Sequence, residues 1–211
     1  MKRFGRTFGR QFGRPRGPLG RLAARLMRRG NAPLNLWMVE LLAVAPQDHV
    51  LEIGFGPGVA LAALLARASG GLVAGVDASG LMVRQARSRH ADAIAAGRLE
   101  IRQGDARSLP YDDATFDKAC GAHVIYFWPD AVAIVRELRR VLRPGGTLAL
   151  AYQERERMPP RAASGLSQAG ARLFGPGEVE KVVRAAGFAD VRVETQATPD
   201  GPAGFCVLAV K

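Results

Sequence analysis

Cysteines and long apolar runs are both scarce in this chain. Its two cysteines, Cys120 and Cys206, stand in apolar, strand-like stretches and are too few for a disulfide framework or a four-ligand zinc site. We interpret both as core thiols and expect no metal centre. The charge-free stretch 53–66 is interrupted by glycine and proline and is shorter than the roughly 20 residues of a membrane span. Because the start of the chain also lacks the apolar core of a secretory signal, we expect a cytoplasmic protein.

Acidic residues are missing from the first part of the chain. None precedes Glu40, whereas ten of the first 29 residues are lysine or arginine. The remaining 20 basic residues nearly balance the 19 acidic ones, so the net charge of +11 resides in this segment. Such a segment can be a solvated tail, or it can bind nucleic-acid phosphates or an anionic membrane surface. Residues 1–18 repeat Phe-Gly-Arg three times, and the glycines weaken a helix, so we expect a flexible basic arm.

The rest of the chain alternates apolar strand-like and helical segments, which indicates an α/β fold. We expect N-terminal helices within 19–45 that act as a lid, followed by one domain over 46–211. The fold class predicted is a Rossmann-like, doubly wound, mainly parallel seven-stranded sheet with a C-terminal antiparallel hairpin. We expect the connection 153–175 to be a surface loop or lid. Strands are expected at 49–53, 72–77, 99–103, 116–122, 146–152, 191–195 and 205–210, and later helices at 57–68, 79–96, 129–142 and 176–186.

A glycine-rich turn follows the first of these strands, in the sequence Glu52-Ile53-Gly54-Phe55-Gly56-Pro57-Gly58, and the second strand ends at Asp77. This pairing predicts a nucleotide-binding crevice, because glycines allow close backbone approach and a carboxylate can accept both ribose hydroxyls. A dinucleotide-binding turn would carry a third glycine where this chain has Val59. Pro57 also removes an N–H that a pyrophosphate would use. The turn therefore favours a nucleoside without phosphates.

Three further segments follow in order, and a family resemblance rests on all four. They are Val73-Ala74-Gly75-Val76-Asp77-Ala78-Ser79, Gly104 to Pro110 with Phe116-Asp117, and Glu137-Leu138-Arg139-Arg140-Val141-Leu142-Arg143-Pro144-Gly145-Gly146. Together they resemble the class I S-adenosylmethionine-dependent methyltransferases, in the small-molecule branch related to the ubiquinone and menaquinone methyltransferases. The resemblance covers the chain from about residue 31 to its end. It implies S-adenosyl-L-methionine as the cofactor and S-adenosyl-L-homocysteine as the product.

The resemblance also assigns roles to residues at the ends of the strands. The glycine turn would lie against the methionine part of the cofactor, Asp77 would hold the ribose, and Asp105 would accept from the adenine amino group. Asp77 and Asp105 could instead only cap the segments that follow their strands. Glu52 could contact the ligand or the N–H groups of the turn. The expected cofactor-binding set is Glu52, Gly54, Gly56, Gly58, Asp77, Ala78, Met82, Asp105, Ala106 and Gly121, with Ala78 and Met82 against the purine and the Ala106 N–H on its edge.

The segment after the fourth strand should face the transferred methyl group. Relatives that methylate exocyclic amines of bases carry Asn/Asp-Pro-Pro-Tyr/Phe here, and this chain does not, which argues against nucleic acid as the substrate. His123 is the candidate base, with a near-neutral pKa as its qualification, although a structural hydrogen bond is the alternative. Tyr126 and Trp128 could contact the substrate or pack beneath the lid.

The sequence thus predicts transfer of a methyl group from S-adenosylmethionine to an oxygen, nitrogen or carbon of a small molecule, by in-line displacement. It does not specify the acceptor, and no obligate protein partner is inferred. A second hypothesis is an RNA-binding protein or RNA methyltransferase that uses the basic arm. A third is a nucleoside-binding protein without catalysis.

Overall fold

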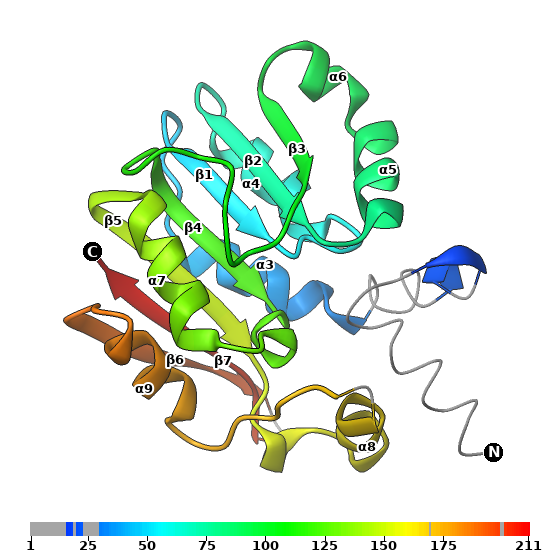
Figure 1. Cartoon of the computed structure of the whole chain (residues 1–211), viewed down its shortest axis with the longest axis vertical. Helices are drawn as coiled ribbons and strands as arrows, with labels where there is room; N and C mark the ends of the chain where they lie inside the picture. Colours follow the sequence, from blue (N-terminus) through cyan, green and yellow to red (C-terminus); the bar gives the residue numbers. More distant parts are fainter. Residues whose placement is uncertain (1–15, 19, 23–29, 169, 199–200) are drawn as a thin grey trace.

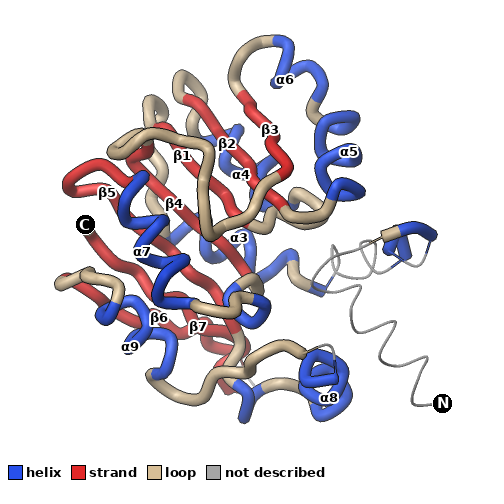
Figure 2. The backbone as a smooth tube through the Cα atoms, viewed as in Figure 1, coloured by secondary structure: helices blue, strands red, loops and turns tan. Residues whose placement is uncertain are grey.

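A computed structural model describes residues 16–18, 20–22, 30–168, 170–198 and 201–211. Most of the predicted basic arm, and most of 19–29 within the expected N-terminal helices, lies outside these residues. A single sheet crosses the molecule, with helices on both faces (Figures 1 and 2). Its strands are β1 (His49–Ile53), β2 (Leu72–Asp77), β3 (Leu99–Gln103), β4 (Phe116–Ala122), β5 (Leu142–Tyr152), β6 (Asp190–Thr198) and β7 (Gly201–Val210).

The strand order is β3-β2-β1-β4-β5-β7-β6. Strands β1 to β5 pair in parallel, and β7 runs antiparallel to both β5 and β6. This arrangement confirms the predicted mainly parallel, seven-stranded sheet with an antiparallel C-terminal hairpin. After β3 the chain returns to place β4 beside β1, so the order of strands reverses between β1 and β4. In open α/β sheets such a reversal leaves a crevice outside the carboxyl ends of the strands.

The sheet divides the apolar core into two layers, and helices cover both. One layer lies between the sheet and helices α7 (Ala131–Val141) and α9 (Glu178–Ala185). The other lies under α3 (Ala32–Leu41), α4 (Val59–Arg67) and α5 (Gly80–Arg89). Helix α7 illustrates why these segments form helices that pack on the sheet. Its apolar residues repeat at helical spacing, and Asp130 caps its first turn through the N–H of Ala133. The described residues also form helices α6 (Ala91–Ala95) and α8 (Pro160–Gln168).

Helix α3 belongs to the core and covers one face of the sheet. Its Leu34, Met38 and Val39 are buried in the layer that includes α4. Leu34 packs so closely on Gly204 of β7 that a Cβ atom there would lie 2.3 Å from Leu34 Cδ1. The proposed division at residue 46 therefore separates segments that pack together, and a lid role for 19–45 stays a prediction.

Three expectations about local structure need correction. The segment 153–175 is not merely a surface loop, because it holds the 3-10 turn η2 (Arg155–Arg157) and helix α8, and it buries Met158 and Phe174. The single helix expected over 79–96 is broken at His90, after which Asp92 stands in the first turn of α6. Strand β5 starts at Leu142 rather than 146, with a register shift opposite Phe116 and Lys118 and a positive φ at Gly145.

Candidate cofactor and methyl-transfer site

Asp77 ends β2 at the strand-order reversal, and it ties two segments of this edge together. Its Oδ2 accepts a hydrogen bond from the Gly56 N–H at 2.8 Å, and its Oδ1 accepts one from the Ser79 N–H at 2.7 Å. Asp77 as a whole residue is only 8% exposed. The first bond joins β2 to the glycine turn after β1, and the second caps the turn that leads into α5. Asp77 is thus a capping residue, and a carboxylate has lone pairs for further donors.

The glycine turn requires backbone conformations that side chains avoid. Gly54, Gly56 and Gly58 have φ values of 61°, 47° and 74°. A Cβ atom at Gly54 would lie 2.4 Å from Val124 Cγ1, whereas one at Gly56 would meet only the Gly54 carbonyl oxygen, at 3.9 Å. Gly56 therefore leaves space in front of the turn, and Gly54 makes room for Val124. Gly58 is the N-cap of α4.

Glu52 lies behind this turn in the middle of the sheet. It is 2% exposed, and its Oε2 has no hydrogen-bond partner among the described residues. Burial raises the pKa of Glu52 well above its ordinary value, and the charge of Asp77 raises it further. Among the described residues no N–H of the turn reaches this oxygen, and contact of Glu52 with a ligand stays a prediction.

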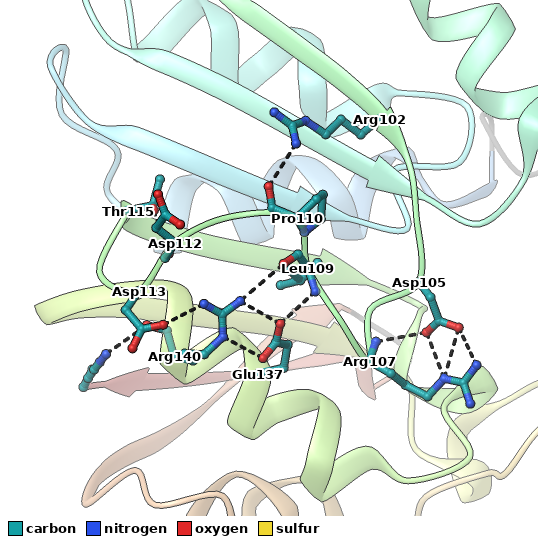
Figure 3. A network of polar contacts seen from close by, with 11 residues as sticks. Arg102, Asp105, Arg107, Leu109, Pro110, Asp112, Asp113, Thr115, Glu137 and Arg140 are labelled. Carbon is teal, nitrogen blue, oxygen red and sulfur yellow. Dashed lines mark hydrogen bonds and ion pairs between the residues drawn. The ribbon is translucent and has the colours of Figure 1, made fainter.

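Asp105 follows β3 and differs from Asp77 in being exposed. Both of its oxygens accept hydrogen bonds from the Arg107 guanidinium, the shortest of them 2.6 Å long (Figure 3). The Arg107 N–H also donates to Oδ1, and the Ser108 N–H donates to the Asp105 carbonyl. The carboxylate therefore stands at the surface of a tight turn, where Arg107 orients it. Ala106, in the same turn, is half-buried.

The remaining expected cofactor contacts divide into exposed and buried residues. Ala78 is exposed beside Asp77. Met82 is 0% exposed within the α4-side core, which corrects the expectation that it faces the purine. Gly121 is buried, and a Cβ atom there would lie 2.8 Å from Val124 Cγ2, so close packing alone accounts for this glycine.

His123 follows β4 in a left-handed backbone conformation, with φ 57°. Its N–H donates to the Ala151 carbonyl of β5 at 2.9 Å, which holds this unusual conformation at the carboxyl end of the sheet. Burial lowers the pKa of His123 to about 4. The expectation of a near-neutral pKa is therefore wrong, since desolvation disfavours the charged ring. At neutral pH the imidazole is uncharged and offers a weakly basic nitrogen.

The two aromatic residues expected near the substrate have different surroundings. Tyr126 is 2% exposed, and its hydroxyl donates to the Gln153 carbonyl at 3.0 Å and accepts from the Gln153 N–H. Of the two alternatives expected for Tyr126, these contacts favour packing within the protein over contact with the substrate. Trp128 is half-buried at the end of the 3-10 turn η1 (Ile125–Phe127). Apolar residues of α8, Ala163 and Leu166, pack against the same core.

Two residues at this edge were missed by sequence reasoning. Val124 contacts both Gly54 and Gly121, and Arg107 binds Asp105. A charged residue two positions after Asp105 was a visible signal for the ion pair. Nothing in the local pattern indicated that Val124 reaches across to the glycine turn. Among the described residues, no helix has the length and apolar composition to cross a bilayer.

Comparison with known proteins identifies the family. A family model described as a methyltransferase domain matches residues 51–150, which include the glycine turn, Asp77, Asp105 and His123. The chain thus carries a methyltransferase domain, and its relatives support a class I S-adenosylmethionine-dependent methyltransferase. An uncharacterised methyltransferase of Bacillus subtilis is 27% identical over 173 residues, which are 82% of this chain and 89% of that protein.

Two further proteins are similar to this chain, one in sequence and one in fold. The 2-phytyl-1,4-naphtoquinone methyltransferase of Synechococcus elongatus is 35% identical over 130 residues, or 59% of this chain, and the match spans only 55% of that enzyme. A methyltransferase of Haloferax volcanii, solved in complex with the Trm112 methyltransferase activator, has the same fold, with a TM-score of 0.76 at 21% identity. That alignment covers 89% of this chain and 93% of the archaeal one.

The cofactor of this methyltransferase is therefore S-adenosyl-L-methionine. The edge of the sheet suits it chemically. The space in front of Gly56, the unsatisfied buried oxygen of Glu52 and the carboxylates after β2 and β3 match a ligand that carries an ammonium group, a ribose diol and a purine amine.

Proposed function

We propose that the ends of β1, β2 and β3 hold S-adenosylmethionine, and that the enzyme transfers its methyl group to a small-molecule acceptor. The observation that carries this proposal is the bond from the Gly56 N–H to Asp77, because it presents the glycine turn and a carboxylate to one ligand. Asp77 would accept the ribose hydroxyls, and Asp105 with the Ala106 N–H would bind the adenine edge. Glu52 would accept from the ammonium group, and Gly54 and Gly56 would line the methionine part.

The cofactor supplies a methyl group already activated on a sulfonium sulfur, which a nucleophile displaces in line. The residues after β4 have the task of placing that nucleophile and excluding water. Trp128 and the apolar residues of α8, which pack against the same core, would form the wall that does so. His123, neutral at physiological pH, can accept a hydrogen bond from the substrate that receives the methyl group and thereby orient that substrate. Its low pKa makes it a weak base, suited to an acceptor that needs little deprotonation.

A small-molecule acceptor is supported by the naphthoquinone substrate named for the cyanobacterial relative. It is also supported by the sequence after β4, which lacks the motif of base-amine methyltransferases. The proposed nucleophile is an oxygen, nitrogen or carbon atom of that small molecule.

The proposal is tested with purified wild-type protein and its Asp77→Ala variant. Mass spectrometry of the wild type should detect a co-purified S-adenosyl compound, and metabolite extracts incubated with it and the cofactor should gain a product 14 Da heavier. The variant should do neither. An equal yield of the heavier product from both proteins would contradict the placement of the cofactor at Asp77.

A further inference from the structure

The segment that follows the fourth strand contains Glu137 and Arg140, to which the cofactor site gives no role. Both residues lie on α7, and both reach back to the loop after β3 (Figure 3). That loop carries Asp105, the residue proposed above to bind adenine. The inference below rests on that proposed role.

Leu109 is the point at which α7 holds the loop. The Leu109 N–H donates to Glu137 Oε1 at 2.7 Å, and the Leu109 carbonyl accepts from Arg140 Nη2 at 3.3 Å. Its side chain is 4% exposed and belongs to the core beneath α7. Both backbone groups and the side chain of this one residue are therefore fixed, although 28 positions separate it from Glu137.

Glu137 and Arg140 also hold each other. Arg140 Nε donates to Glu137 Oε2 and Arg140 Nη2 donates to Glu137 Oε1, both at 2.8 Å, so the pair is bidentate. Arg140 Nη1 donates to Asp113 at 2.7 Å, which fixes the far end of the same loop. The hydrogen bond from Arg140 lowers the pKa of Glu137, so the carboxylate stays charged at neutral pH. The planar guanidinium thus serves three acceptors at once.

A short turn joins this anchor to Asp105. The Ser108 N–H donates to the Asp105 carbonyl at 3.1 Å, directly before Leu109. On the other side, the Gly104 N–H donates to the Asp77 carbonyl at 3.2 Å. The turn that carries Asp105 is therefore held at one end by β2 and at the other by α7. Its own carboxylate is bound by the exposed Arg107, and exposed ion pairs fix geometry weakly.

We propose that Glu137 and Arg140 are positioning residues for purine recognition, which act through Leu109 to set where the Asp105 carboxylate and the Ala106 N–H meet the base. Adenine presents an amino donor and a ring-nitrogen acceptor to that pair. Hypoxanthine presents a carbonyl oxygen and an N–H in the same places, so both contacts become repulsive. A rigid turn rejects hypoxanthine, whereas a loosened turn can move away from it.

The test is the ratio of calorimetric dissociation constants for S-inosyl-L-homocysteine and S-adenosyl-L-homocysteine, measured on the full-length protein. The wild type should prefer the adenosyl compound by at least about tenfold, as expected for hydrogen bonds to a charged group. Glu137→Gln should reduce the preference to less than about threefold, mainly by weakening the adenosyl compound. Arg140→Lys keeps the charge but loses the bidentate geometry, and it should show the same loss of preference. It serves as the test if Glu137→Gln does not fold.

Asp117→Asn is the matched control. Asp117 also accepts from a backbone N–H, that of His49, and from an arginine, Arg143, but it does so where β1 and β4 begin, at the opposite end of the sheet. This variant should lower the melting temperature and keep the purine preference. A full preference in folded Glu137→Gln or Arg140→Lys would overturn the inference. A full preference in Asp105→Asn would instead contradict the proposed role of Asp105 itself.

Discussion

The ends of β2 and β3 each present an aspartate at the same edge of the sheet, but the two are held in different ways. Asp77 is buried, and backbone N–H groups of the glycine turn and of Ser79 bind its two oxygens. Asp105 is exposed, its oxygens are bound by Arg107, and its turn is fixed from α7. Backbone groups at the ends of the strands hold Asp77. Side chains, of Arg107 and of residues on α7, hold Asp105 and its turn. We therefore expect affinity to depend on the β2 end and selectivity for the base on the loop after β3.

Replacing Asp77 should have the largest effect. In Asp77→Ala the N–H groups of Gly56 and Ser79 lose their acceptor in a buried place, which costs about 1–3 kcal/mol of folding free energy for each unsatisfied group. Affinity for S-adenosylhomocysteine should fall at least about a hundredfold, because the turn and the ribose contact are lost together. Calorimetry and thermal unfolding measure the two effects. Asp77→Asn keeps one acceptor oxygen, so its affinity and its stability should both lie between those of Asp77→Ala and the wild type.

On β1, Glu52 is a third carboxylate at this edge, and it is buried with no partner for Oε2 in the described part of the chain. Its raised pKa means that the unfolded chain releases the Glu52 proton at a lower pH than the folded one, so stability falls as pH rises from the ordinary value through the folded pKa. Glu52→Gln removes this loss. This variant should raise the melting temperature at pH 8 and weaken the binding of S-adenosylhomocysteine about tenfold. A variant that is neither more stable nor weaker in binding would remove Glu52 from the site.

Replacing Asp105 should separate binding from folding. Asp105→Asn should weaken S-adenosylhomocysteine about fivefold, while its free energy of unfolding stays within about 0.5 kcal/mol of the wild type, because the residue is exposed. Urea titration and calorimetry on the same preparations check both values. Destabilisation as large as that of Asp77→Ala would show that the two strand ends are held alike.

His123 should have the smallest effect on cofactor binding, less than about twofold for His123→Asn, since asparagine tolerates the left-handed backbone. Its role should appear in the pH dependence of folding. The pKa of about 4 lies below that of an unfolded histidine, so the stability from the neutral ring is present above that unfolded pKa and is lost as pH falls toward 4. The variant should lack this component in unfolding experiments between pH 7 and 4. An identical pH profile would show that the ring is not desolvated.

The sequence was sufficient for the parts of the fold that local patterns determine. The bounds expected for β1 to β4 match the structure, because β2 is a short apolar run, β3 begins with alternating apolar and charged residues, and turn residues bound the strands. The glycine turn and Asp77 could be placed at one edge, since parallel strands end on the same side of a sheet.

Contacts between distant segments could not be predicted in this way. The hydroxyl of Tyr126 binds Gln153, 27 positions away, so an aromatic residue near the mouth of the site lies in the core instead. Burial lowers the pKa of His123, which residue type alone does not indicate. Proline and glycine within 153–175 suggested a loop, but Pro160 occupies the first position of α8, where its missing N–H costs nothing.

The most direct test of the account is a calorimetric titration of the wild-type protein with S-adenosylhomocysteine and, under the same conditions, with NAD. The glycine turn, with Pro57 inside it and Val59 after it, predicts one bound S-adenosylhomocysteine per chain and no measurable heat from NAD. Binding of NAD with no binding of S-adenosylhomocysteine would contradict the account.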